Sequence, residues 1–164
     1  MTDAKTKAVP TSNVDPDVAS GVAQFLGPVV VDLQALAVDG KQAHWHVRGR
    51  NFIGVHELLD VVVAHAQAYA DLAAERVIAL GLPIDARIQT VASKTTTPAL
   101  EPGFQQSDDT IAAVVASIDA ALVTVRTAIE ELDDIDLTSQ DVAIEIARGL
   151  EKDRWFLDAH IAAE

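Results

Sequence analysis

Apolar and small residues recur with helical spacing along four long stretches of the chain, and each stretch is bounded by residues that start or stop helices. Asp15 followed by Pro16 opens the first stretch, because an N-cap carboxylate and a proline at the first helical position both favour helix initiation. Gly27 and Pro28 interrupt this stretch and predict either a kink or a later start. The four predicted helices cover residues 15–47, 51–80, 107–132 and 138–162.

The other three helices carry comparable signals at their ends. Asn51 is the expected N-cap of the second helix, which Gly81 ends. Ser107 is the expected cap of the third, and residues 138–141 (Thr-Ser-Gln-Asp) form a variant capping box that opens the fourth. Residues 1–14 are polar and lack periodicity, so we expect them to form a flexible N-terminal arm.

The stretch between the second and third helices, residues 82–106, has no long helical pattern and contains Pro83 and Pro102. A connection of this length inside a compact domain is unusual unless the topology requires it. Within it, residues 88–94 are expected to form a short helix of about two turns. Four long helices with two short connections and one long middle crossover predict an all-α fold. Residues 15–164 are therefore expected to form a ferritin-like four-helix bundle with a short extra helix in the crossover.

Composition narrows the class of protein further. The 164 residues are 49% hydrophobic and 4% aromatic, which suits one well-buried domain. Cysteine is absent, which excludes disulfides, thiolate metal sites and cysteine nucleophiles. No 18 apolar residues run together and no apolar segment follows the N-terminus, so a cytoplasmic protein with no membrane partner is expected. The formal net charge of −13 lacks the clustered positive charge on which nonspecific DNA binding depends.

Four side chains of metal-ligand type lie on one stripe of the second predicted helix, namely His56, Asp60, Asp71 and Glu75. They form two i,i+4 pairs that are offset by about three helical turns. Burying such groups without partners would cost several kcal/mol each, so their placement needs a reason. Because the two pairs are about 16 Å apart along the helix axis, one chain cannot bring both to the same metal ion.

Either the pairs are separate sites, or a second copy of the chain completes a shared site. The residue numbers favour the second arrangement, because 56 and 75 average 65.5 and so do 60 and 71. Two antiparallel copies of the helix, related by a two-fold axis between residues 65 and 66, would place the first pair of one chain against the second pair of the other. A symmetric dimer would then hold two identical His/carboxylate sites. The alternative is that these residues are surface charges and a histidine satisfied by internal hydrogen bonds.

The remaining histidines are assigned by their positions. His44, near the end of the first helix, is the natural additional ligand, and Trp45 beside it would flank the metal and could donate an electron to an oxidising intermediate. His46 is expected to be partly exposed, and His65 and His160 to be structural. No Glu-x-x-His pair, the mark of an internal di-iron site, is present, which supports a site at an interface. Imidazole and carboxylate ligands without thiolate suit iron(II), zinc or manganese.

Several motifs spread over residues 20–162 are more specific together than any one alone. They are K-Q-A-H-W-H-V-R-G at 41–49, N-F at 51–52, H-E-L-L-D at 56–60, Asp71, A-E-R at 74–76, L-E-K at 150–152 and W-F at 155–156. In this combination the chain resembles the Dps family of ferritin-like mini-cages. The resemblance implies a hollow homododecamer that oxidises iron(II), preferably with hydrogen peroxide, and stores the ferric mineral in its cavity.

Carried over residue by residue, the resemblance implies ferroxidase sites at two-fold interfaces, with two iron ions per site. His44, His56 and Asp60 would come from one subunit, and Asp71 and Glu75 from its mate. The residue numbers indicate the same pairing independently. Such a protein would protect the cell from oxidative stress, and zinc is a further divalent metal that the site could hold.

The chain departs from the family pattern at two places. His46 stands where asparagine is common, so the polarity beside the site differs. Members that compact DNA generally use lysine-rich termini, whereas the basic residues of this N-terminal arm are Lys5 and Lys7, so DNA binding is not expected. In the family the turn between the third and fourth helices lines a three-fold pore, so Asp136 and Asp141 are expected to attract iron(II) inward.

Two other functions stay open at this point. The same ligands could hold a metal-bound hydroxide that hydrolyses small acyl amides or esters. A DNA-binding, nucleoid-associated cage with vestigial metal chemistry is the second alternative.

Overall fold

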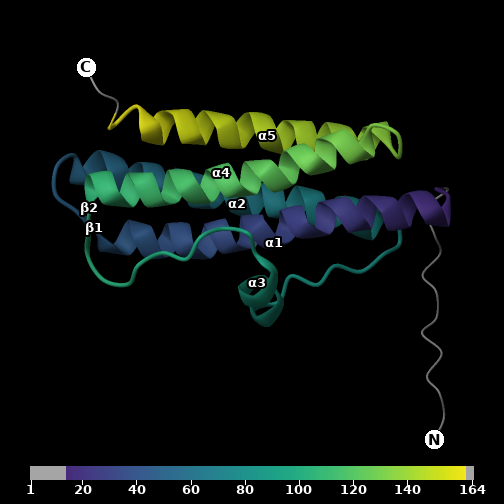
Figure 1. The fold of residues 1–164 in the computed structure, drawn as a ribbon, viewed down its shortest axis with the longest axis horizontal. Coiled ribbons are helices and arrows are strands. Elements are labelled where there is room, and N and C mark those ends of the chain that lie inside the picture. Colours follow the sequence, from purple (N-terminus) through teal and green to yellow (C-terminus); the bar gives the residue numbers. More distant parts are fainter. Residues whose placement is uncertain (1–13, 162–164) are drawn as a thin grey trace, which may run out of the picture.

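The computed structural model describes residues 14–161, so all but the last residue of the predicted arm at 1–14 lies outside the described residues. Four long helices lie side by side, and a short helix packs outside them in the connection between the second and the third (Figure 1). This confirms the predicted all-α bundle with its extra helix. The elements are α1 (Pro16–His46), β1 (Val47–Arg48), α2 (Phe52–Ala79), α3 (Ile88–Lys94), β2 (Gln105–Gln106), α4 (Ser107–Leu132) and α5 (Leu137–Asp158).

The direction of the helices explains the long crossover. Figure 1 shows α2 and α4 running the same way along the bundle, so the chain between them must return over the full length of the helices. At its far end β2 pairs in parallel with β1, with Val47 opposite Gln105 and Arg48 opposite Gln106. This two-residue pairing was not predicted, because two residues carry no alternating pattern. It joins the end of α1 to the start of α4.

The predicted start of α1 is confirmed. The Asp15 carboxylate accepts a hydrogen bond of 2.8 Å from the backbone amide of Asp17, and Pro16 is the first helical residue. The helix continues through Pro28, so the alternative of a later start is wrong. Pro28 is exposed, which lets the helix carry the proline ring on its solvent side.

Two of the predicted N-caps are wrong. Asn51 has a φ of 55° and its side chain makes no capping hydrogen bond, so it serves as a left-handed turn residue, a conformation that asparagine tolerates well. Ser107 lies inside α4 and is buried, while Gln106 holds the N-cap position without a side-chain cap. The pairing of β2 with β1 has already set the direction of the chain there, so α4 starts without a polar cap.

The last helix also differs from the expectation at both ends. Its cap is Asp136, whose Oδ2 accepts a hydrogen bond of 2.9 Å from the amide of Ser139, so α5 begins before the capping box predicted at 138–141. A carboxylate at this place stabilises the free amide groups of the first turn. The helix ends at Asp158, earlier than predicted.

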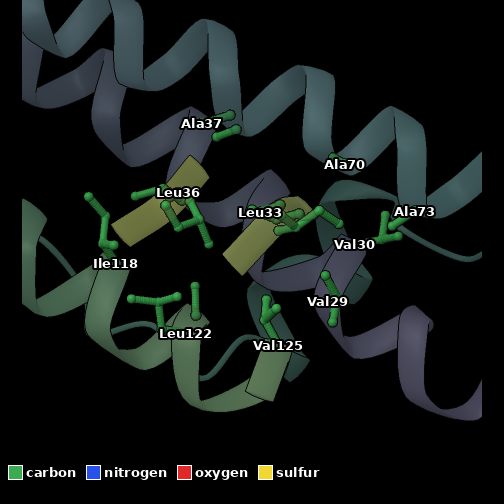
Figure 2. Packing of buried hydrophobic residues seen from close by; sticks show 14 of the residues in the cluster. Val29, Val30, Leu33, Leu36, Ala37, Ala70, Ala73, Ile118, Leu122 and Val125 are labelled. Carbon is green, nitrogen blue, oxygen red and sulfur yellow. The ribbon is translucent and has the colours of Figure 1, made fainter. Parts of the chain in front are cut away.

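Leucine, isoleucine and valine side chains of α1 and α4 fill the centre of the bundle, where alanines of α2 pack against them (Figure 2). The small alanine side chains let α2 lie close to α1, and the branched residues fill the wider space toward α4. The fully or nearly fully buried members include Leu33, Leu36, Ala70, Ala73, Ile118 and Val125. By length and composition alone α1 and α4 are apolar enough to cross a membrane, a test that the core helices of a bundle also pass.

Asp32 ties the crossover to two of the long helices. Its carboxylate is 1% exposed and accepts hydrogen bonds from the hydroxyls of Thr95, Thr96 and Thr124 and from the amide of Thr96, at 2.6–2.9 Å. A buried carboxylate is tolerable when it receives this many donors. Asp32 therefore connects α1, the segment after α3, and α4 at one point.

A second buried carboxylate joins α2 to α5. Both oxygens of Asp153 lie 2.9 Å from Nδ1 of His65, which must therefore donate its proton to them. The prediction that His65 is structural agrees with this contact. Burial raises the pKa of Asp153, and the hydrogen bond from His65 and the charge of Lys152 oppose the rise.

The raised pKa of Asp153 predicts a pH dependence of stability. A carboxyl whose pKa is higher in the folded than in the unfolded chain stabilises the fold fully below its unfolded pKa, and this contribution is lost as the pH rises through the folded pKa. Asp153→Asn removes the titration but keeps an oxygen that accepts from His65. We therefore expect the melting temperature of the variant, measured relative to that of the native chain, to rise as the pH increases from about 4 to 8. Melting curves across this range check it, and a constant difference would contradict it.

Candidate metal centre

His44 and His56 hold each other in place through their backbones. Nδ1 of His44 lies 2.7 Å from the carbonyl oxygen of His56, and Nδ1 of His56 lies 2.9 Å from the carbonyl oxygen of His44. The two rings stack with centroids 3.7 Å apart and planes 21° apart. Because a carbonyl can only accept, both Nδ1 atoms carry the proton, and in the neutral rings both Nε2 atoms keep a free lone pair. Such backbone hydrogen bonds typically orient histidines that ligate metal.

Asp60 lies one helical turn after His56 and adds a carboxylate to this pair. Its Oδ1 is 3.4 Å from Nδ1 of His44 and also forms an ion pair with the ammonium of Lys41. The hydrogen bond from Lys41 holds the pKa of Asp60 below its usual range, and the charge of the Lys41 ammonium acts in the same direction. Asp60 is therefore ionised at neutral pH, as a metal ligand must be.

The other two predicted ligands lie further along the same helix. Asp71 and Glu75 are exposed, and their side chains make no hydrogen bond or ion pair with another residue of the range 14–161. Within that range, no three His, Asp or Glu side chains are grouped so that one chain could hold a metal ion. The structure puts His44 in contact with His56 and with Asp60, but these three alone are not grouped as a metal site, and Asp71 and Glu75 lie apart from them. The division of the ligands between two chains stays a prediction.

The surface beside Asp60 carries apolar side chains. Trp45 is 62% exposed and Val38 is 64% exposed. A hollow of about 530 Å³ lies between α1 and α2, and its lining includes Trp45, Asp60 and Lys41. Uncovered apolar surface around a hollow is typical of a face that receives another protein chain.

Asp136 and Asp141, the predicted pore residues, are in different environments. Asp136 accepts hydrogen bonds from Arg76 (2.7 Å) and from Ser139, and is about one-fifth exposed. Burial acts to raise the pKa of Asp136, but the hydrogen bonds from Ser139 and Arg76 outweigh it, so its pKa is lowered. Asp141 is exposed and makes no ion pair with another described residue. Of the two, Asp141 has the freer carboxylate.

Sequence reasoning missed two cations near the predicted ligands. Lys41 precedes His44 by three residues, so helical spacing puts it on the same face, a signal that was available. Arg76 follows Glu75 directly, but its guanidinium reaches Asp136 and Ser139 across the bundle, which no local pattern indicates. His46 is partly exposed as predicted; its Nδ1 donates to the carbonyl of Gln42 at 2.9 Å.

Comparisons with known proteins agree with this fold. The ferritin-like domain family matches residues 26–163. The chain is 36% identical over 147 residues to the "DNA protection during starvation protein" of Mycolicibacterium smegmatis, covering 87% of this chain and 78% of that protein. It is 34% identical over 143 residues to the protein of the same name from Agrobacterium fabrum, covering 87% of this chain and 88% of that protein.

Solved structures give the same result. The structure of Dps from Microbacterium arborescens in the high iron form superposes with a TM-score of 0.89 at 65% identity, over 92% of this chain and 98% of that chain. The tetragonal form of Mycobacterium smegmatis Dps superposes with a TM-score of 0.87 at 33% identity, over 93% of each chain. The chain belongs to the Dps family of ferritin-like proteins.

Proposed function

We propose that this chain is a ferroxidase and iron-storage protein that protects the cytoplasm from oxidative stress. One observation carries the proposal. Nδ1 of His44 and Nδ1 of His56 each donate a hydrogen bond to the other residue's backbone carbonyl, which leaves both Nε2 atoms available to a metal, beside the ionised Asp60. Imidazole nitrogens and carboxylates suit iron(II), which is the substrate here, and zinc fits the same donor set.

The site needs a second copy of the chain. Asp71 and Glu75 are exposed on the helix that carries His56 and Asp60. The exposed apolar side chains around the hollow are surface that a second chain would bury. A two-fold axis between residues 65 and 66 of α2 would bring both carboxylates of the partner to the histidines, and would bury the same surface. Twelve such chains would assemble into a cage with two iron ions at each interface site.

Hydrogen peroxide is the proposed oxidant, because it accepts two electrons and the site holds two iron(II) ions. Two iron(II) ions, one peroxide molecule and two protons give two iron(III) ions and two water molecules. A paired two-electron step avoids release of a hydroxyl radical. Trp45, which is exposed and lines the same hollow as Asp60, would supply an electron if one iron ion reacts alone.

Acidic residues of the turn between α4 and α5 are the proposed route for iron(II) into the cage. Asp141 is exposed, while Asp136 is held by Arg76 and Ser139 and so contributes negative potential more than direct ligation. DNA is not a proposed partner, because a chain of net charge −13 repels a phosphate backbone.

Iron loading with size analysis tests the proposal as a whole. Iron(II) and hydrogen peroxide are added to the full-length protein, and protein and iron are followed together through a calibrated sizing column. We expect iron to co-elute with a species of about 209 kDa, twelve times the chain mass of 17.4 kDa. Elution as a dimer without iron would contradict storage. Assays on small acyl amides and a salt-dependent gel shift with the same preparation separate the hydrolytic and DNA-binding alternatives.

A further inference from the structure

Lys41 contacts the oxygen of Asp60 that lies next to His44. Its ammonium pairs with Oδ1 of Asp60, the same atom that lies 3.4 Å from Nδ1 of His44. Lys41 lies on α1, one turn before His44, and its side chain is 36% exposed. A cation is therefore already paired with the carboxylate oxygen that lies next to His44.

The charge at this place explains why a cation is held there. His44 and His56 offer lone pairs, and Asp60 carries a negative charge. The proposed interface would add two more carboxylates from the partner, so each site collects three negative charges. Arg76, which follows Glu75 in the chain, is engaged with Asp136 and Ser139 instead. Among the ion pairs of residues 14–161, the one between Lys41 and Asp60 is the pair that brings a lysine or arginine to a proposed ligand.

We propose that Lys41 is an internal counter-ion of the metal centre: its ammonium balances the site before metal binds, and a divalent ion must displace it from Asp60. This inference rests on the proposed interface site. A metal ion bound by the histidines and by Oδ1 of Asp60 would compete with the Lys41 ammonium for the same oxygen and would be repelled by its charge. Lys41 therefore lowers the affinity for metal and stabilises the interface in its absence.

The test uses full-length protein treated with EDTA and cobalt(II), which binds the same donor types as iron(II) and does not oxidise under these conditions. Lys41→Met keeps most of the aliphatic stem and removes the charge, and Lys41→Arg keeps the charge. Lys94→Met is the matched control, because Lys94 is exposed and forms no ion pair with a described residue. Calorimetric titration and the visible spectrum of cobalt(II) report binding without any turnover.

We expect Lys41→Met to bind cobalt(II) about five- to tenfold more tightly than the native chain, the range for a half-exposed charge a few Å from the metal. Lys41→Arg and Lys94→Met should bind like the native chain. Unchanged affinity for cobalt(II) in Lys41→Met, or an equal increase of affinity in Lys94→Met, would overturn the inference. Neither result would contradict the proposed interface site. No cobalt(II) binding by the native chain would overturn both.

A second measurement separates a counter-ion from a residue that only packs. Without metal, Lys41→Met leaves the interface carboxylates unbalanced, so its melting temperature should fall below that of the native chain. Adding cobalt(II) should close or reverse this gap, because the variant binds the ion more tightly and ligand binding stabilises the folded state. A gap that persists at saturating cobalt(II) would show a packing role instead and overturn the inference.

Discussion

Two inactive variants should restore each other's activity when they assemble together. Asp60→Asn and Glu75→Gln each remove a proposed ligand without changing side-chain size, and each alone should lower the rate of iron(II) oxidation by at least about 100-fold, more than the loss of a residue that only supports a ligand. In a mixed dimer one site carries both substitutions and the other carries none. If the chains pair at random, half of the dimers are mixed, so about one quarter of the native rate should return.

The two variant chains carry different tags and are co-expressed in equal amounts, so that mixed dimers form. Oxidation is followed by the absorbance of ferric iron after addition of peroxide. A chain carrying both substitutions is the control: mixed with the native chain, it should leave about one quarter of the rate, whereas sites within one chain would leave about half. No recovery in the first mixture would refute the assignment of Asp60 and Glu75 to one site built by two chains.

The second large effect concerns Asp32 and the stability of the bundle. Asp32→Ala should lower the free energy of unfolding by about 3–5 kcal/mol, because it removes the buried acceptor of four hydrogen bonds. For a chain of this size the melting temperature should fall by roughly 10 °C. The segment around Thr95 and Thr96 should also become easier to cleave, since its attachment to α1 and α4 depends on this carboxylate.

Calorimetric melting at one protein concentration and limited proteolysis check both results. Thr127→Val is the matched control on α4, because the Thr127 hydroxyl is exposed and donates to the carbonyl of Val123 in its own helix. It should change the melting temperature little. A loss below about 1 kcal/mol in Asp32→Ala would show that water replaces the carboxylate, and that Asp32 does not anchor the crossover.

The sequence alone determined the long helices and supplied the residues of the proposed metal site. Apolar residues at helical spacing predict each helix because burial of one face is a local property of the pattern. The site could be read in the same way: i,i+4 spacing puts His56 with Asp60, and Asp71 with Glu75, on one face. Their common midpoint indicates a second copy, because a two-fold axis pairs residues by the sum of their numbers.

The tertiary structure decided which polar groups meet across the bundle. Asp32 finds Thr95, Thr96 and Thr124, and Asp136 finds Arg76, through contacts between residues about 60 or more positions apart. The helix starts followed these contacts: Asp136 caps α5 in place of the predicted box, and β2 positions α4 without the predicted serine cap. Periodicity and spacing constrain one helix at a time, whereas the partner of a buried charge depends on how the helices pack.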